Sequence, residues 1–308
     1  MNISEWSRMS RVLSNEIEDF FEMNRPVLDE FLNSLLERDV DTEAIEVSKY
    51  ISEGGKRIRG LLMLYFLKLL KGDYEYGIPA AASLELVHSC SLAIDDIIDE
   101  DVMRRGRPSA WIAKGLSKTV LVSNLLIPLA IKGVEYLGFD AVKLVVDTWL
   151  KVTRGEIADV FETKRTYLEI IALKTSSLFQ LSLMLSAIAS GRKDLLITFR
   201  DYGLYLGYIY QISDDILDIR EYFEKSRAKP PFADKMMSWL KIEGEKSDWN
   251  TLIEKAKPWL SSFLNRTREI ASHAGEAKLS EVMEKLPLFV ANKILEEGGL
   301  SWEKIISL

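Results

Sequence analysis

The chain has 308 residues, 47% of them hydrophobic, and a net charge of −7 at pH 7. This length allows one large domain or two ordinary ones, and an acidic chain without a basic stripe is not expected to bind nucleic acid. The single cysteine, Cys90, excludes an internal disulfide and a multi-cysteine zinc site. It fits a reducing compartment, and because the first residues show no apolar signal segment, we expect a soluble, cytoplasmic protein.

With only 17 glycines and 8 prolines, the chain is expected to be mostly helical. The longest apolar run, residues 119–131, is too short to span a bilayer and is interpreted as a buried core helix, so no membrane anchor is expected. Neither a repeat nor a domain linker is visible, and residues 1–308 are predicted to form a single all-α bundle. Apolar periodicity predicts helices over residues 3–38 (kinked or broken at Pro26), 42–51, 61–70, 78–101, 118–133, 139–164, 167–190, 200–222, 251–271 and 278–297, with a polar, irregular stretch over 224–250.

Two DDxxD clusters, residues 95–99 and 214–218, lie inside apolar helical stretches. Helical spacing aligns Asp95 with Asp99 and leaves Asp96 at their edge, and the second cluster repeats this with Asp214, Asp215 and Asp218. Crowded carboxylates on an apolar helix repel one another, and a divalent cation removes that penalty. One such motif could be a solvated acidic helix end, but two copies predict a metal–diphosphate site.

Cations precede the helix predicted over 61–70, where they oppose the helix dipole. Lys56, Arg57 and Arg59 either bind an anion beside free backbone N–H groups or form a solvated basic turn. His88 lies two helical turns before Asp95 and shares its face, so it is either a ligand or a satisfied core residue.

Further cations follow the first cluster. Arg104 and Arg105 offer planar forks suited to bidentate phosphate contacts. Lys174 stands among apolar residues, where it is costly to leave unpaired.

The order of these motifs resembles the trans-prenyltransferases, the polyprenyl diphosphate synthase family, and the chain looks geranylgeranyl-diphosphate-synthase-like. The family pattern is GGKxxR, a His before DDxxD, RRGxP, GQxxD, KT and QxxDDxxD. This chain carries, in the same order over residues 51–234, Gly54-Gly55-Lys56-Arg57-Ile58-Arg59, His88, Asp95 to Asp99, Arg104-Arg105-Gly106-Arg107-Pro108, Gly155-Glu156 with Asp159, Lys174-Thr175, and Gln211 to Asp218.

The resemblance implies a helical bundle of the isoprenoid synthase type, usually a homodimer, with a deep central cavity between the two DDxxD helices. It implies about three Mg2+ per active site, held by Asp95, Asp99 and Asp214. The allylic diphosphate would bind Arg104, Lys174 and Lys229, and isopentenyl diphosphate would bind Lys56, Arg59, His88 and Arg105. Supporting catalytic or binding roles fall to Asp96, Thr175, Gln211, Asp215 and Asp218.

The implied reaction is the Mg2+-dependent, head-to-tail condensation of isopentenyl diphosphate with an allylic diphosphate through a carbocation. In the family, residues four and five positions before the first Asp form the floor of the elongation tunnel. Here these are Ser91 and Cys90, both small, with Val87 one turn deeper, so we expect all-trans products of C20 or longer. Cys90 is also compatible with an ordinary buried thiol.

The chain departs from the family pattern at several positions. Glu156 replaces a usual Gln and is expected to repel a neighbouring carboxylate or to need its own cation, and Ile94 replaces a usual His. The loop 228–234 keeps Lys229 and Asp234 but lacks two glycines, and no second lysine is clearly placed.

Two alternatives therefore remain. One is a non-catalytic diphosphate-binding subunit of a heteromeric synthase, which the altered loop favours and the six aspartates oppose. The other is a class I terpene cyclase, which would not need Lys56, Arg59 and Arg105.

Overall fold

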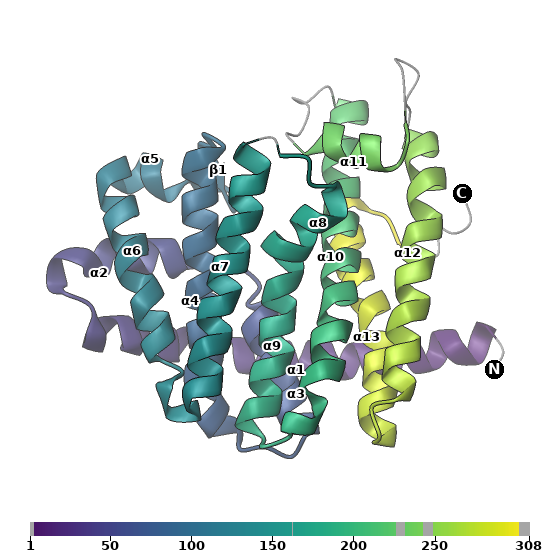
Figure 1. Ribbon diagram of the computed structural model, residues 1–308, viewed down its shortest axis with the longest axis horizontal. Coiled ribbons are helices and arrows are strands. Elements are labelled where there is room, and N and C mark those ends of the chain that lie inside the picture. The colour runs from purple at the N-terminus through teal and green to yellow at the C-terminus, as the bar shows by residue number, and fades with distance from the viewer. Residues whose placement is uncertain (1–2, 162, 226–231, 243–248, 302–308) are drawn as a thin grey trace.

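Helices account for most of the chain in the computed structural model, which describes residues 3–161, 163–225, 232–242 and 249–301 (Figure 1). The helices are α1 (Ile3–Asp39), α2 (Thr42–Ser52), α3 (Ile58–Leu69), α4 (Tyr74–Ile98), α5 (Ala110–Lys114), α6 (Leu116–Lys132), α7 (Phe139–Val160), α8 (Tyr167–Ile171), α9 (Ser177–Ala189), α10 (Leu196–Lys225), α11 (Ala233–Trp239), α12 (Trp249–Ser272) and α13 (Ala277–Leu295). Strands β1 (Met103–Arg104) and β2 (Arg107–Pro108) form a small hairpin, and a π-helical turn spans Ala172–Ser176.

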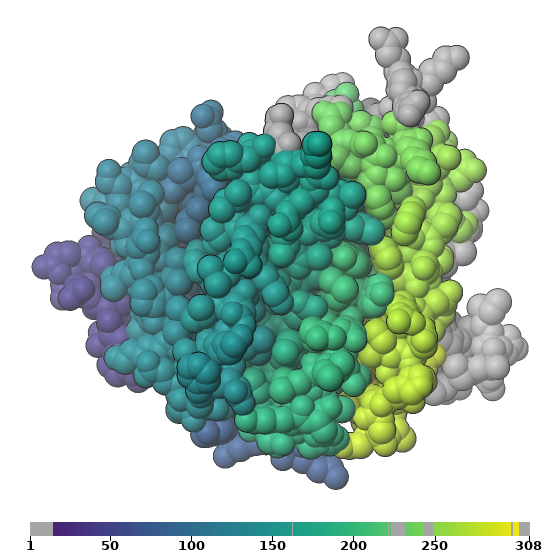
Figure 2. Space-filling model, viewed as in Figure 1, coloured from purple at the N-terminus to yellow at the C-terminus, as the bar shows by residue number. Residues whose placement is uncertain are grey.

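The long helices lie side by side, and the prediction of an all-α bundle is confirmed. In Figure 1, α7, α9, α10 and α12 run roughly parallel across the front, while α1 crosses behind them. The space-filling view of the same face shows the side chains of these helices covering it (Figure 2). Helix α10 packs against α9, α12 and α13, and α4 packs against α3 and α6.

The apolar core consists of two clusters that both include α10. The larger cluster takes Phe199, Tyr202 and Leu206 from the first half of α10. The smaller one takes Ile209 and Ile216 from its second half, together with α11, α12 and the end of α13. Because the clusters meet along one continuous helix, the two halves of the bundle are joined through their cores.

Several elements differ from the sequence predictions. Helix α1 continues through Pro26 without a break. The stretch 224–250, predicted to be irregular, contains helix α11, and the predicted helix 167–190 contains the π turn. A hollow on the surface is lined by α1 side chains between Glu22 and Glu37. The deep central cavity stays a prediction.

The segment 119–131, predicted to be a buried core helix, is only partly buried. Among the described residues, three helical segments are long and apolar enough to cross a membrane by length and composition: Tyr74–Ile98 and Tyr167–Ala189, each 72% buried inside the bundle, and Leu116–Leu137, only 28% buried. Helix α6 buries Val122 and Leu126 but exposes Leu116, Val120 and Leu121. Apolar periodicity located this helix, but it did not show that a second apolar face points away from the core.

Candidate active site

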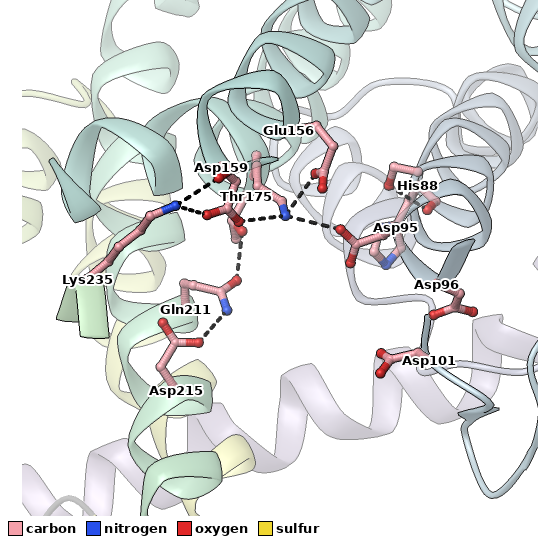
Figure 3. Close-up of polar contacts among 12 residues, drawn as sticks. His88, Asp95, Asp96, Asp101, Glu156, Asp159, Thr175, Gln211, Asp215 and Lys235 are labelled. Carbon is pink, nitrogen blue, oxygen red and sulfur yellow. Dashed lines mark hydrogen bonds and ion pairs between the residues drawn. The ribbon is translucent and has the colours of Figure 1, made fainter. Parts of the chain in front are cut away.

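Lys174 lies at the centre of a charged cluster formed by α4, α7 and the π turn. Its Nζ lies 2.8 Å from Glu156 Oε2, 3.1 Å from Asp95 Oδ1 and 3.4 Å from Asp159 Oδ2. In Figure 3 the side chains of Glu156, Asp159 and Asp95 converge from two sides on this ammonium group. Burial lowers the pKa of Lys174, but the carboxylates of Asp95 and Glu156 outweigh it, and the pKa is raised. Both expectations for Glu156 have a counterpart here: it shares the Lys174 cation, while burial and the nearby Asp95 raise its pKa to about 7.

Small residues allow the π turn to approach its neighbours closely. A Cβ at Gly155 would lie 2.7 Å from Lys174 Cγ, so only glycine admits the lysine stem against α7. A Cβ at Gly207 would lie 2.4 Å from Ser176 Cα, so glycine at this position lets α10 pack directly against the π turn. The π turn also changes the direction of Lys174 relative to a regular helix, since π turns insert an extra residue into the helical ladder.

A second lysine reaches the same cluster from α11. Lys235 Nζ is ion-paired with Asp159 Oδ1 and lies 3.2 Å from the backbone oxygen of Asp159. Figure 3 shows Lys235 approaching Asp159 from the side opposite to Asp95. Sequence reasoning assigned Lys235 no role, and its partner lies 76 positions away in the chain, where no local pattern points to it.

The three carboxylates of the first DDxxD cluster point in different directions. Asp95 faces Lys174, whereas the buried Asp96 accepts a hydrogen bond from Arg104 Nε at 2.6 Å. Asp99 is the C-cap of α4 and its side chain is exposed. Partial desolvation and the nearby Asp95 raise the pKa of Asp99 to about 6, and desolvation also raises the pKa of Asp96 despite Arg104.

The second cluster is organised around Gln211. Thr175 Oγ1 donates to Gln211 Oε1 at 2.7 Å, and Gln211 Nε2 donates to Asp215 Oδ1 at 2.8 Å. The hydroxyl of Tyr167 donates to the other oxygen of Asp215, which is buried. Asp215 thus faces the interior of the bundle.

Asp214 and Asp218 complete this cluster. Burial raises the pKa of Asp214, and the positive charges of Lys56 and Arg59 oppose that rise. Asp214 therefore lies on the side of the predicted isopentenyl diphosphate residues. Asp218 is exposed one turn further along α10.

Arg59, which is buried, and His88, which is half-buried, form a nitrogen-rich pair. Arg59 Nη1 lies 3.0 Å from His88 Nε2, and its guanidinium carbon lies 5.0 Å and 5.4 Å from the ring centroids of Phe179 and Tyr210. Burial, together with the charge of Arg59, lowers the pKa of His88 well below its usual value, so the ring is neutral at pH 7. Arg59 Nε and His88 Nδ1 are buried without a hydrogen-bond partner, and buried donors of this kind are costly unless a ligand satisfies them.

The hairpin after α4 carries Arg104 and Arg105. Arg104 lies against Asp96, and Arg105 Nη1 donates to the backbone oxygen of Glu53 at 3.0 Å. Desolvation and, to a smaller extent, the positive charges of Arg57 and Arg104 lower the pKa of Arg105. Lys56 lies on the loop that Arg105 contacts and has an exposed side chain.

The carboxylates fit Mg2+ that is shared with a substrate. Within the described ranges, no group of three or more His, Cys, Asp or Glu side chains is close enough to hold a metal alone. Mg2+ typically keeps waters and binds one or two carboxylates together with substrate phosphate oxygens. Asp95, Asp99 and Asp214 supply only oxygen donors of this kind, so their chemistry suits the predicted metal, and their role as its ligands stays a prediction.

The predicted tunnel floor lies on the buried side of α4. Val87 and Cys90 are fully buried, and Ser91 is half-buried with its hydroxyl bonded to the backbone oxygen of His88 at 2.8 Å. Burial raises the pKa of the Cys90 thiol to about 12, so this thiol is unreactive. Lys229 lies outside the described residues.

Comparison with known proteins agrees with this fold and motif order. Residues 42–248 match the family model described as polyprenyl synthetase. A hexaprenyl pyrophosphate synthase of Saccharolobus solfataricus is 32% identical over 286 residues, which cover 92% of this chain and 98% of that protein. A geranylgeranyl diphosphate synthase of Sulfolobus acidocaldarius is 30% identical over 67% of each chain. The solved geranylgeranyl pyrophosphate synthetase of Geoglobus acetivorans superposes with a TM-score of 0.73 at 22% identity, covering 91% of this chain and 99% of its own.

The fold and the motif order define an all-α prenyltransferase of the isoprenoid synthase type. The chain belongs to the polyprenyl synthetase family.

Proposed function

We propose that the protein condenses isopentenyl diphosphate head-to-tail with an allylic diphosphate in a Mg2+-dependent reaction. The observation that carries this proposal is the network linking both aspartate clusters. Lys174 contacts Asp95, and its neighbour Thr175 contacts Gln211 of the second cluster. A lysine beside the first cluster, linked through its neighbour to the second, would stabilise the charge of a diphosphate that metal ions hold between the two clusters.

The residues divide into two binding sites. Arg104, Lys174 and Lys235 are the cations beside the first cluster, and we assign them to the allylic diphosphate. Arg59 and His88 have buried nitrogens without partners, which suit the oxygens of a second diphosphate. Lys56 and Arg105 complete that isopentenyl site, and their charges would hold the second substrate beside the first.

The reaction breaks the bond between the allylic carbon and its diphosphate. Mg2+ held by Asp95, Asp99 and Asp214 would supply positive charge that stabilises the leaving diphosphate. The double bond of isopentenyl diphosphate then forms the new carbon–carbon bond, and a proton leaves to restore a double bond. His88 is neutral and hydrogen-bonded to Arg59, so we assign it to binding and the proton to the released diphosphate. The apolar core excludes water, which would otherwise quench the cation.

We propose products of C20 or longer. The small side chains of Cys90 and Ser91 lie one turn above the buried Val87, and none of them is bulky enough to end elongation early. Relatives named for geranylgeranyl, hexaprenyl and octaprenyl products all match this chain, so the family alone leaves the length open.

The test is an incubation of the purified protein with isopentenyl diphosphate, Mg2+ and C5, C10 or C15 allylic primers. Product length is then resolved, with Asp95→Ala as the control. We expect a Mg2+-dependent series of products ending at one length, which the control lacks. If no primer is elongated while diphosphate still binds, the protein is a non-catalytic subunit. Conversion of a primer without isopentenyl diphosphate would indicate a cyclase.

We further propose a homodimer that covers the outer faces of α6 and α7. Leu121 is 69% exposed on α6, and Phe139 is 78% exposed on α7. Val146 and Leu150 of α7 are also exposed, and large apolar side chains exposed on adjacent helices are typical of association surfaces. Sedimentation should give twice the chain mass, and Leu121→Glu should shift the protein toward monomers, because it buries a charge in the interface. Wild-type protein that sediments as a monomer would refute the dimer.

A further inference from the structure

The hairpin of β1 and β2 presents two neighbouring arginines to two different sites. Arg104 lies on Asp96, beside the first cluster, while Arg105 lies on Glu53 and the glycine loop. The two turn residues, Arg105 and Gly106, have φ angles of 54° and 74°. These values form the left-handed turn typical of two-residue hairpins, but a non-glycine residue adopts this conformation at a cost. The turn therefore needs an external support.

Arg107, opposite Arg104 in the hairpin, supplies that support. Its Nη1 lies 2.5 Å from Glu53 Oε2, and its Nη2 lies 2.7 Å from the backbone oxygen of Tyr50 and 3.2 Å from that of Glu53. Both backbone oxygens are at the C-terminal end of α2, where carbonyl groups lack helical partners and the dipole favours a cation. The sequence motif gave this position no role, because RRGxP leaves it variable.

The ring of Tyr50 holds the same hairpin from the other side. The guanidinium carbon of Arg107 lies 4.2 Å from the centre of this ring, within the range of a cation–π contact. The Tyr50 hydroxyl also donates to the backbone oxygen of Pro108 at 2.6 Å. Arg107 and Tyr50 together fix β2 to the end of α2.

The same attachment fixes Arg105 over the loop that carries Lys56. Glu53 O accepts from both Arg105 and Arg107, so the two guanidinium groups lie side by side. A Cβ at Gly55 would lie 2.7 Å from Arg105 Cζ, so Arg105 rests directly on that glycine. Without Arg107, the hairpin would keep only the Tyr50–Pro108 bond and the Arg105–Glu53 bond to the end of α2, and Arg105 would be held less firmly over the loop.

We propose that Arg107, with Tyr50, is a positioning residue for the isopentenyl diphosphate site. It acts through Arg105 and does not touch the substrate. This inference rests on the proposed function, because it takes Arg105 as a ligand of isopentenyl diphosphate. Arg104 has its own anchors in Asp96 and Asp101, so the allylic site depends less on Arg107.

The test compares Arg107→Ala, Arg107→Lys and Tyr50→Phe with Lys114→Ala. Lys114 is the matched control, since its Nζ lies 4.9 Å from the same Tyr50 ring but its ion pair is with Glu46 of α2. Steady-state kinetics with each substrate varied are combined with calorimetric titration of isopentenyl diphosphate and with thermal unfolding. Tyr50→Phe keeps the ring and removes only the bond to Pro108, so it remains informative if Arg107→Ala folds poorly.

Arg107→Ala should raise the KM and the Kd for isopentenyl diphosphate about tenfold, the effect of weakening one charged hydrogen bond. The KM for the allylic substrate and the kcat should stay within about twofold. The KM and Kd of Arg107→Lys for isopentenyl diphosphate should lie between those of Arg107→Ala and the wild type, because an ammonium group reaches fewer of the three acceptors. Lys114→Ala should have the same KM values and the same Kd as the wild type.

A purely structural role predicts a different pattern. It would lower the unfolding temperature and the active fraction while leaving both KM values unchanged, and that result would overturn the proposal. The calorimetric Kd separates this inference from the proposed function. If wild type binds isopentenyl diphosphate without elongating a primer, a weaker Kd in Arg107→Ala still supports the positioning role. If the wild-type protein does not bind isopentenyl diphosphate, both the proposed function and the positioning role of Arg107 are wrong.

Discussion

Replacing Lys174 by methionine should destabilise the metal-free protein, and Mg2+ should partly restore its stability. The variant keeps the apolar stem that packs on Gly155 and removes only the ammonium group. That group is the shared partner of Asp95, Glu156 and Asp159 at 2.8–3.4 Å, and its side chain is 24% exposed. Three carboxylates would then remain close together without their common cation.

The size of the effect follows from this geometry. A charged hydrogen bond contributes about 1.5–3 kcal/mol, but contacts that share one group are not additive. Removing one partner of a fully buried pair costs about 3–5 kcal/mol, and the exposure of Lys174 reduces that figure. We therefore expect the free energy of unfolding in EDTA to fall by about 2–4 kcal/mol. Proton uptake by Glu156, whose pKa burial already raises, limits the loss.

Urea unfolding in EDTA and in Mg2+ measures this effect. On the proposed function, Mg2+ would bind the native state and stabilise it by mass action, and in the variant it would no longer compete with Lys174 for Asp95. The gap between wild type and Lys174→Met should therefore narrow in Mg2+. Lys143→Met is the control, because Lys143 forms an exposed ion pair with Asp147, both on α7. This substitution should lower the free energy of unfolding by less than about 0.5 kcal/mol. Equal losses in the two variants, or a gap that Mg2+ leaves unchanged, would refute the reasoning.

Three further changes test other parts of the site. Lys235→Met should raise the KM for the allylic substrate about fivefold, because Lys235 contacts Asp159 beside Lys174. The KM for isopentenyl diphosphate should stay unchanged. Equal shifts in both KM values would show that Lys235 does not belong to the allylic site. Burial and the nearby Asp95 raise the pKa of Asp99 to about 6. If Asp99 is a ligand, as we propose, Mg2+ would bind its ionised form, and Mg2+ affinity should fall about tenfold per pH unit below that pH and level off above it. Titration of Asp99→Asn should lack this dependence, and a variant that keeps it would disprove the assignment. Cys90→Phe should shorten the products and Cys90→Ala should not, because only the larger side chain blocks the predicted tunnel; chromatography that shows no shortening would exclude Cys90 from the floor.

The helices were predictable because apolar side chains recur at helical spacing, a signal that depends only on local sequence. The same spacing predicts Asp95 and Asp99 on one face of the helix, but it did not reveal that Asp96 turns to Arg104. That direction depends on the hairpin, whose turn uses Arg105 in a left-handed conformation. A non-glycine residue there has no clear sequence signal.

Long-range contacts account for the other differences between the sequence predictions and the structure. Lys235 reaches Asp159 from a helix inside a stretch predicted to be irregular. The π turn that aims Lys174 depends on close packing at Gly155 and Gly207, which only the folded bundle defines. Motif order identified the residue types, while tertiary packing determined their partners.

The most direct test of the central claim is the release of inorganic pyrophosphate by the purified protein with each substrate alone and with both. The account predicts release only when Mg2+, an allylic diphosphate and isopentenyl diphosphate are all present, with one pyrophosphate formed per isopentenyl unit consumed. Release from the allylic substrate alone at the same rate, or none from the complete mixture, would contradict it.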